Sequence, residues 1–600
     1  MPHHTKTARS IRVLAALAAA GLLAACTNQP RHEPTPDTGA SGGGGGGDLR
    51  TVAERSGWRA TATHREVVEL VDALARLSPL AQRDSMGQSY EGRDLPLLII
   101  ADPPVRTPEE ARRSGKPVFF VFANIHAGEV AGKEASLMFA RELLLEPGEP
   151  RNRLLLDNLV LLIAPIYNAD GNERFAPDNR PGQDGPEHGM GVRPNAQGLD
   201  LNRDYMKLDA PESRAMVRLL NEWDPHVIMD LHTTNGSRHR YTLTYEAPLH
   251  PASAPAPVAY LRDELLPAVS ARMEAETGYA SFYYGNFDPE RTRWFTYDHR
   301  PRFGANYHGL RGRISILSEA YSYAPYKDRV LATLAFVRHC AEHAANDARR
   351  ILALARETDE DTTARGQRAQ DDVPVRAARA ALPDTAHIRT WAWAEESSPT
   401  ARRPDGAPRR EIDESRPIVL EVAHEGRFEP TRGVRRPLAY IVPPGNDRVI
   451  ENLHHHGVRV HTITEALTTG VLFADETNGE SGASGGSGGV PRGTRAGDVR
   501  TIGVERATVT EIVRAERAFQ GVHLVRVETE TSRADLDPRA LPVGTHIVTT
   551  AQPLGTLAVL LLEPESDDGL TAWGFFDDAL RAGAPHPILR VSGGGGRGRK

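Results

Sequence analysis

The sequence predicts an α/β domain whose mixed or largely parallel sheet is covered by helices on both faces. Apolar segments of strand length alternate with segments of helical periodicity between about residues 64 and 355. Several strand segments are continuously apolar, which is typical of strands buried on both faces. Polar residues gather at the ends of these strands, and open α/β sheets bind their ligands at that edge. The pattern therefore predicts both the fold class and the place of the functional site.

The elements of this domain are expected in a regular order. A stripe of apolar residues indicates a helix over 64–77, and the strand at 95–100 follows a turn. Five of the seven residues at 118–124 are valine or phenylalanine, which indicates a buried strand, and helical signals resume at Val130 and continue to about Leu145. The remaining expected elements are strands at 159–164, 227–231 and 314–317, helices at 211–223 and 324–355, and a long surface loop at 176–200.

The N-terminal segment has the features of an export signal. A basic start precedes the wholly apolar or glycine segment 13–25, which ends in Leu-Ala-Ala before Cys26. This pattern predicts a signal peptide over 1–26 and a bacterial lipobox, with Cys26 lipidated. Thr27, and not an aspartate, follows this cysteine. Residues 27–48 include six consecutive glycines and are expected to form a flexible tether. The globular part would then lie outside the cytoplasm, held to a membrane only by its lipid anchor.

Charge and cysteine content narrow the possible partners and stabilising features. The formal net charge is −7, and no basic tract is interleaved with aromatic residues, so no nucleic-acid partner is expected. The chain has two cysteines, and lipidation of Cys26 would leave Cys340 without a partner. Core burial rather than an intrachain disulfide is therefore expected to stabilise the fold.

The sequence changes character after the α/β domain, which is expected to cover 49–356. Residues 357–416 are charged and arginine-rich, and they are expected to form a connecting segment. A strand-rich accessory domain is predicted over 417–591, with a Gly/Ser-rich insertion at 476–498, and 592–600 form a Gly/Arg tail. Its expected elements are strands at 417–422, 438–442, 458–463, 501–504, 523–527, 546–549 and 557–562, and a short helix at 448–456.

Four polar motifs follow one another along the α/β domain. They are His126-x-x-Glu129, Asp200-x-Asn202-Arg203, His232 and Glu319. Imidazole nitrogens and carboxylate oxygens are both zinc ligands, although an isolated His-x-x-Glu is most often an ordinary turn. Together and in this order, the motifs resemble those of the zinc metallocarboxypeptidase family, the carboxypeptidase A and B type. The resemblance covers about residues 60–350.

The resemblance implies a site for one Zn²⁺ per chain. Its ligands would be His126, Glu129 and His232, which leave a coordination position for water. Asp200 would hold His126 in the tautomer that binds metal. Glu319, in Ile-Leu-Ser-Glu-Ala-Tyr, resembles the general base that takes a proton from water and returns it to the leaving amine.

The resemblance also implies a substrate-binding set. Asn202 and Arg203 would bind the terminal carboxylate of the substrate, for which a guanidinium fork is well suited. Residues 193–203 fit the family pattern Arg-x-Asn-x-x-Gly-x-Asp-Leu-Asn-Arg, which makes Arg193 the group that polarises the scissile carbonyl. The family closes its site with a flexible tyrosine. Tyr297 lies at a suitable distance before Glu319, Tyr307 is the alternative, and either one could be an ordinary core aromatic residue.

The implied function is a zinc-dependent carboxypeptidase that acts on the C-termini of peptides or proteins. A zinc amidohydrolase of the related deacylase branch is one alternative, and a non-catalytic binding lipoprotein on a peptidase fold is another. The run at 230–236, Asp-Leu-His-Thr-Thr-Asn-Gly, departs from the digestive carboxypeptidases and leaves the substrate preference open. The consecutive histidines 454–456 are expected to lie on a solvated surface, and His188 and His308 receive no role.

Overall fold

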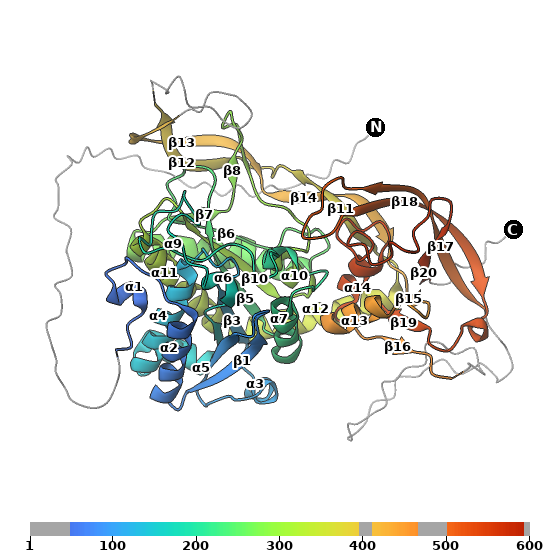
Figure 1. Ribbon diagram of the computed structural model, residues 1–600, viewed down its shortest axis with the longest axis horizontal. Coiled ribbons are helices and arrows are strands. Elements are labelled where there is room, and N and C mark those ends of the chain that lie inside the picture. The colour runs from blue at the N-terminus through green and yellow to red at the C-terminus, as the bar shows by residue number, and fades with distance from the viewer. Residues whose placement is uncertain (1–47, 395–410, 466–500, 593–600) are drawn as a thin grey trace, which may run out of the picture. The chain divides into compact units, whose positions relative to one another are not determined.

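The computed structural model describes residues 48–394, 411–465 and 501–592 (Figure 1). The predicted signal peptide with Cys26, nearly all of the tether, the Gly/Ser-rich insertion and nearly all of the Gly/Arg tail lie outside the described residues. Among the helices of the described part, none is long and apolar enough to cross a membrane.

An eight-stranded mixed sheet forms the centre of the α/β domain. In spatial order its strands are β1 (Ala81–Gln88), β2 (Asp94–Ile100), β4 (Val160–Ala164), β3 (Val118–Ala123), β5 (Val227–Thr234), β10 (Ile314–Tyr321), β6 (Leu243–Glu246) and β7 (Ser281–Tyr283). The four central strands β4, β3, β5 and β10 are parallel, whereas β2 and β6 join them in antiparallel orientation. The predicted fold class is therefore confirmed, including the parallel character of the buried centre.

Helices cover the sheet on both faces, as Figure 1 shows. The helices α4 (Ala131–Leu145) and α11 (Tyr326–Asn346) pack on each other and on the central strands, with α2 (His64–Leu77) against α4. The helices α10 (Gly304–Leu310) and α7 (Pro211–Trp223) lie on the other side of the sheet. The apolar side chains between these layers form the main core.

Close packing fixes α4 on the sheet next to the predicted metal site. A Cβ atom on Gly132, in the first turn of α4, would lie 2.5 Å from Leu231 Cβ and 3.2 Å from Ala123 Cβ. Leu231 precedes His232, and Glu129 precedes α4. The contact between α4 and β5 therefore sets the distance between Glu129 and His232. Glycine is required here because no other residue lets the helix backbone approach two strands this closely.

The C-terminal region is rich in strands, as predicted. Its largest sheet has six antiparallel strands in the order β16 (His461–Thr462), β19 (His546–Thr549), β15 (Ala439–Val442), β20 (Pro585–Val591), β17 (Ile502–Arg514) and β18 (Val525–Leu536). The antiparallel pair β11 (Asp372–Ala380) and β14 (Arg427–Arg435) forms a second sheet. Strands from the segment expected to be a connector therefore belong to the folded structure.

A third C-terminal sheet includes strands of the α/β domain. The strands β12 (Ala386–Trp393) and β13 (Ile412–Glu425) pair with each other, and β13 pairs in parallel with β9 (Arg293–Phe295) of the hairpin that β9 forms with β8 (Asn286–Phe287). The chain segment that follows β9 carries Tyr297. The C-terminal region is thus joined to the α/β domain immediately beside a predicted site residue.

The remaining helices are short or connect these layers. They are α1 (Val52–Arg55), α3 (Pro108–Ser114), α5 (Pro150–Asn158), α6 (Ala169–Asn172), the 3-10 turn η1 (Leu201–Arg203), α8 (Pro255–Ala259), the π-helical turn η2 (Tyr260–Leu265), α9 (Leu266–Thr277), α12 (Ala348–Arg368), α13 (Asp447–His456), the 3-10 turn η3 (Pro538–Ala540) and α14 (Gly555–Leu562).

Several sequence-based expectations need correction. The segment 557–562 is the buried helix α14 rather than a strand, because a short, wholly apolar run does not distinguish the two. The single helix expected at 324–355 is two helices, α11 and α12, which are separated at Asp347. Strand β1 was not predicted, since its sequence AQRDSMGQ is mostly polar, and the strand expected at 458–463 shortens to β16. Strands β5 and β10 continue to Thr234 and Tyr321, beyond their predicted ends.

Candidate active site

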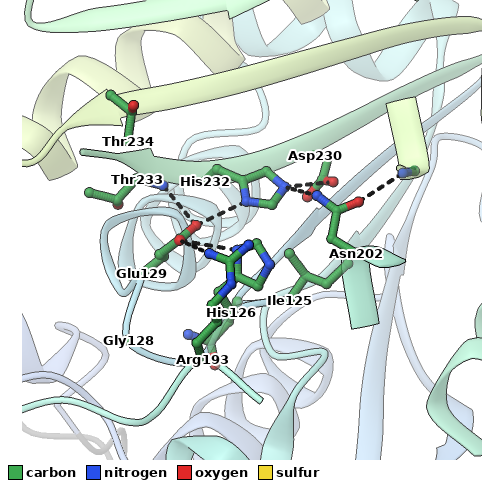
Figure 2. Close-up of polar contacts among 12 residues, drawn as sticks. Ile125, His126, Gly128, Glu129, Arg193, Asn202, Asp230, His232, Thr233 and Thr234 are labelled. Atoms are coloured by element: carbon green, nitrogen blue, oxygen red, sulfur yellow. Dashed lines mark hydrogen bonds and ion pairs between the residues drawn. The ribbon is translucent and has the colours of Figure 1, made fainter. Parts of the chain in front are cut away.

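Three predicted metal ligands converge at the carboxyl ends of the central parallel strands. His126 follows β3, Glu129 lies in the turn before α4, and His232 lies within β5. One ligand atom from each lies within 4.8 Å of the other two. His126 Nδ1 lies 3.0 Å from Glu129 Oε1, and His232 Nδ1 lies 2.9 Å from Glu129 Oε2 (Figure 2). All three side chains are buried, so the group forms a compact set of two nitrogens and one carboxylate.

Two further carboxylates hold the outer nitrogens of the histidines. Asp200 Oδ1 lies 2.9 Å from His126 Nε2, and Asp230 Oδ2 lies 2.8 Å from His232 Nε2. A proton on His126 Nε2 donates to Asp200 and leaves the Nδ1 lone pair free to face Glu129, while Asp230 lies within ion-pair distance of His232 Nε2. This donor set fits zinc, which takes neutral imidazole nitrogens and carboxylate oxygens. Asp230 was not predicted, although its position two residues before His232 on the same strand face was visible in the sequence.

The charges around Glu129 favour its ionised form. Burial by itself would raise the pKa of Glu129, but the neighbouring His126 and Arg180 lower that pKa well below its ordinary value. Thr233 N also donates to Glu129 Oε2 at 3.0 Å. Asp200 behaves similarly, since burial opposes ionisation but His126, followed by nearby arginines, lowers its pKa. Both carboxylates are therefore anionic, as a cation site requires.

A cavity of about 270 Å³ opens beside the metal-ligand group. Its lining combines polar and aromatic side chains from the central sheet and from loops that are distant in sequence. The lining residues are His126, Glu129, Arg180, Arg193, Asn202, Arg203, His232, Thr233, Thr234, Asn235, Tyr284, Tyr297, Phe303, Ala305, Leu317 and Glu319. Asp200 does not line the cavity, because it lies behind His126.

Glu319 lies in the cavity wall, beside His232 on the neighbouring strand. The two residues are register partners on the parallel strands β10 and β5, and Thr244 of β6 flanks Glu319 on its other side. Burial raises the pKa of Glu319 to about 8, and the nearby Glu129 and Asp230 act in the same direction against the opposing effect of His232. The position places a carboxyl group with a raised pKa close to the three converging side chains.

Asn202 and Arg203 occupy the turn η1 and line the cavity, where Asn202 Nδ2 lies 3.4 Å from His232 Nε2. Asp200 begins this turn, and its Oδ1 accepts from Asn202 N at 2.9 Å. Asn202 Oδ1 accepts from Gly304 N at 2.8 Å, and the guanidinium carbon of Arg203 lies 3.7 Å from the centre of the Phe303 ring. Within the described parts of the chain, no carboxylate lies within 4 Å of the Arg203 guanidinium. The turn thus presents a cation without a paired anion.

Arg193 lies at the rim of the cavity. Its Nε donates to Asp200 Oδ2 at 2.9 Å, and its Nη1 lies 3.6 Å from Glu129 Oε1. The side chain is 44% exposed, which leaves part of the guanidinium open to a ligand. Figure 2 shows this arginine beside His126 and Glu129.

The structure distinguishes the two candidate tyrosines. Tyr297 lines the cavity, where its ring contacts Phe303 at 5.5 Å and Tyr284 at 5.8 Å between ring centres. Tyr307 is fully buried, and its hydroxyl lies 2.7 Å from His456 Nδ1, away from the cavity lining. Tyr307 is therefore a core residue. His456 is buried with it, so the expectation of a solvated surface is wrong for this histidine.

Arg180 and Tyr284 are among the cavity residues that had no sequence signal. Arg180 Nη1 donates to Glu129 Oε1 at 2.8 Å, and its Nη2 donates to the carbonyl of Thr233 at 3.0 Å. Arg180 comes from the long loop at 176–200, in which arginines are common and no motif marks this one. Tyr284 lies between the short strands β7 and β8, where the sequence predicts no element at all.

Comparisons with known proteins agree with this site. Residues 67–237 match the family model described as zinc carboxypeptidase. Mouse carboxypeptidase Z is 34% identical over 151 residues, which are 24% of this chain and 22% of that protein. The chain thus matches about a fifth of the length of such relatives. Carboxypeptidase 2 of Trichophyton rubrum is 20% identical over 541 residues, which are 85% of this chain and 83% of that protein.

Solved structures give weaker likenesses. The metallo-carboxypeptidase of Pseudomonas aeruginosa is 17% identical, with a TM-score of 0.35 over 48% of this chain and 68% of that one. Carboxypeptidase A of Helicoverpa armigera is 16% identical, with a TM-score of 0.35 over 48% of this chain and 74% of that one.

The family match contains most of the site but not all of it. Residues 67–237 include the three converging side chains and the Arg193 to Arg203 run, while Glu319 lies beyond the matched segment. The α/β domain of this chain is therefore similar to the zinc carboxypeptidases over residues 67–237, and the four motifs lie in the order expected from that similarity.

Proposed function

We propose that this protein is a zinc-dependent carboxypeptidase that hydrolyses the terminal peptide bond of peptides or proteins. The observation that carries the proposal is Arg203. Its guanidinium is largely buried in the cavity wall, and the described residues offer it no carboxylate within 4 Å. Burial lowers the pKa of Arg203, which is the effect expected of a cation that lacks a counter-ion. A substrate with a free terminal carboxylate would supply that counter-ion.

The side chains around Arg203 suit the recognition of a planar anion. The ring of Phe303 supports one face of the guanidinium, so its donor edge stays oriented. The amide of Asn202 lies in the same turn and adds a donor beside it. A carboxylate bound between the two would place the last peptide bond toward the metal ligands.

The residues near the metal ligands support hydrolysis of that bond. Zinc held by His126, Glu129 and His232 would supply a Lewis acid that polarises the carbonyl and makes water more acidic. Asp200 and Asp230 keep the two imidazoles oriented through their outer nitrogens.

Proton transfer is assigned to Glu319 and charge stabilisation to Arg193. Glu319 would accept a proton from the attacking water and then donate it to the amine of the leaving amino acid. The partly exposed guanidinium of Arg193, at the rim beside Glu129, would bind the negative charge that develops on the carbonyl oxygen. Tyr297, with Phe303, would shield the bound substrate from water.

A comparison of free-acid and amidated peptides tests the proposal. Removing one partner of a desolvated charge pair costs about 2–5 kcal/mol. We therefore expect amidation of the substrate, or Arg203→Ala, to lower kcat/KM by about 30- to 4,000-fold. The two losses should not add, because both remove the same interaction. Arg65→Ala, at an exposed position on α2, is the control and should change neither rate.

Two results would contradict parts of the proposal. Similar wild-type rates on free-acid and amidated peptides would reject carboxypeptidase activity. Fully additive losses would keep an exopeptidase but move the carboxylate site away from Arg203.

A further inference from the structure

We propose that the C-terminal region supports the carboxylate-binding wall, and that Gln520 is a positioning residue for Asn202 and Arg203. The inference rests on the proposed carboxypeptidase function and extends it to a part of the chain outside the α/β domain. It assigns a role to the loop between β17 and β18, which the resemblance to known carboxypeptidases leaves without one.

Gln520 makes a direct contact with the turn that carries Arg203. Its Oε1 accepts a hydrogen bond from Asp200 N at 2.7 Å, across 320 positions of sequence. Asp200 in turn accepts from Asn202 N and holds Arg193 and His126 through its carboxylate. The amide that Gln520 binds is therefore the first donor of the turn η1. Fixing that donor fixes where the turn begins.

The backbone at Gln520 is strained in a way that a simple loop does not require. Phe519 and Val522 pair through both of their backbone hydrogen bonds, at 2.8 and 3.0 Å, and enclose a two-residue turn. The turn residues Gln520 and Gly521 have φ angles of 51° and 79°. Asparagine followed by glycine is the favoured pair in such a turn, and a longer side chain is disfavoured at the first position. Gln520 departs from this preference, and its extra methylene is what reaches Asp200.

A second attachment holds the other side of the arginine pocket. Arg302 N donates to Asp568 Oδ2 at 2.6 Å, and Arg302 Nε donates to Asp568 Oδ1 at 2.7 Å. The Arg302 guanidinium also lies between the rings of Phe519 and Trp573, with its carbon 5.1 and 4.7 Å from their centres. Arg302 and Asp568 are both buried. The C-terminal region therefore holds Arg302, the residue immediately before Phe303, through hydrogen bonds and ring contacts.

These two attachments hold the two chain segments that form the proposed carboxylate site. Phe303 supports the guanidinium of Arg203, and Gly304 N donates to Asn202 Oδ1. The turn η1 and the segment 302–304 thus contact each other at the site, and each is fixed to the C-terminal region. The position of the Arg203 donor edge relative to the metal ligands then depends on residues more than 300 positions away.

Shortening the side chain at position 520 separates positioning from folding. Gln520→Asn suits the turn better but lacks the reach to Asp200, and Gln520→Gly removes the side chain while keeping the turn. Glu516→Asp is the matched control, because it removes one methylene from an exposed side chain of the same loop. Each full-length, zinc-loaded variant is assayed for KM and kcat on free-acid and amidated peptides, and for Tm. In a Glu319→Gln background, which blocks turnover, the Kd of the same labelled peptides is measured by fluorescence anisotropy.

The expected signature is a loss of discrimination without a loss of stability. Gln520→Asn and Gln520→Gly should keep or raise Tm, and they should raise KM and Kd for the free-acid peptide about tenfold, the effect of about 1.4 kcal/mol. Values for the amidated peptide and kcat should change little, and Glu516→Asp should match wild type. Equal losses on both peptides, or no loss on either, would overturn the inference. If wild-type protein bound both peptides equally, that result would overturn the proposed function itself. It would do so whatever the Gln520 variants show.

Discussion

Glu319 and the two histidines line the same cavity, and their replacements are expected to fail in different ways. Glu319 is not among the three converging side chains, whereas His126 and His232 each supply a nitrogen to them. A variant of the proton-transfer group should therefore keep the metal, and a variant of a ligand should lose it. The distinction also separates an enzyme from a binding protein on the same fold, because only the enzyme needs Glu319.

We expect Glu319→Gln to bind one zinc per chain but to lower kcat by about 10²- to 10⁴-fold, the usual contribution of a general base. His126→Ala and His232→Ala should lose zinc itself, as should wild-type protein treated with a chelator. Atomic emission spectrometry and a peptidase assay on the same samples measure both quantities. Near-normal turnover by Glu319→Gln would show that the proton acceptor has been assigned wrongly.

At the scale of elements, the fit of α4 against β3 and β5 brings the ligands together. Glu129 ends the turn into α4, and His232 follows Leu231 on β5, so their separation depends on how closely helix and sheet approach. Gly132 lies at this contact, and a Cβ atom added there would be 2.5 Å from Leu231 Cβ.

We expect Gly132→Ala to lower the free energy of unfolding by about 1–3 kcal/mol, as overpacked cores do, although alanine favours helices. Zinc affinity should fall as well, because the helix must move away from β5. Thermal unfolding and zinc titration provide the measurements. Gly148→Ala is the control, since an added Cβ there meets no atom within 4 Å. Unchanged stability and zinc affinity in Gly132→Ala would mean that the helix position does not set the site.

For the whole molecule, stability should depend on the protonation of a glutamate buried in the sheet. Glu246 on β6 is buried, and this burial raises its pKa to about 7, despite hydrogen bonds from Thr296 and the backbone of Ala247. Between the ordinary glutamate pKa and pH 7, the folded state keeps a proton that the unfolded state loses. Stability contributed by this group therefore falls as the pH rises through that window.

Glu246→Gln should remove this pH dependence. We expect the variant to be more stable than wild type at pH 8 by up to about 3 kcal/mol, and to approach wild type at pH 5. Glutamine keeps an acceptor for Ala247 N and can donate to the hydroxyl of Thr296. Urea unfolding at the two pH values tests the difference, with the exposed Glu360→Gln as control. A stability gain in Glu246→Gln that is the same at both pH values would contradict the assignment.

Local sequence patterns determined the central strands, the helices α2, α4 and α7, and the four motifs. Continuous apolar runs such as 118–124 have few structural alternatives when turn and helix signals bound them. His126 and Glu129 converge because a strand end and a helix start lie three residues apart. The predicted helices 64–77 and 211–223 coincide with α2 and α7, since capping and periodicity are properties of neighbouring residues.

Only the tertiary structure decided which distant groups complete the site. Arg180 and Tyr284 reach the cavity from loops without a motif, and Gln520 reaches Asp200 from the C-terminal region. The same limit explains α14, because the apolar run 557–562 is compatible with either a strand or a buried helix until its neighbours are known. Periodicity and spacing reflect the interactions of a residue with its neighbours in sequence. Contacts across hundreds of residues depend on packing, which no local pattern contains.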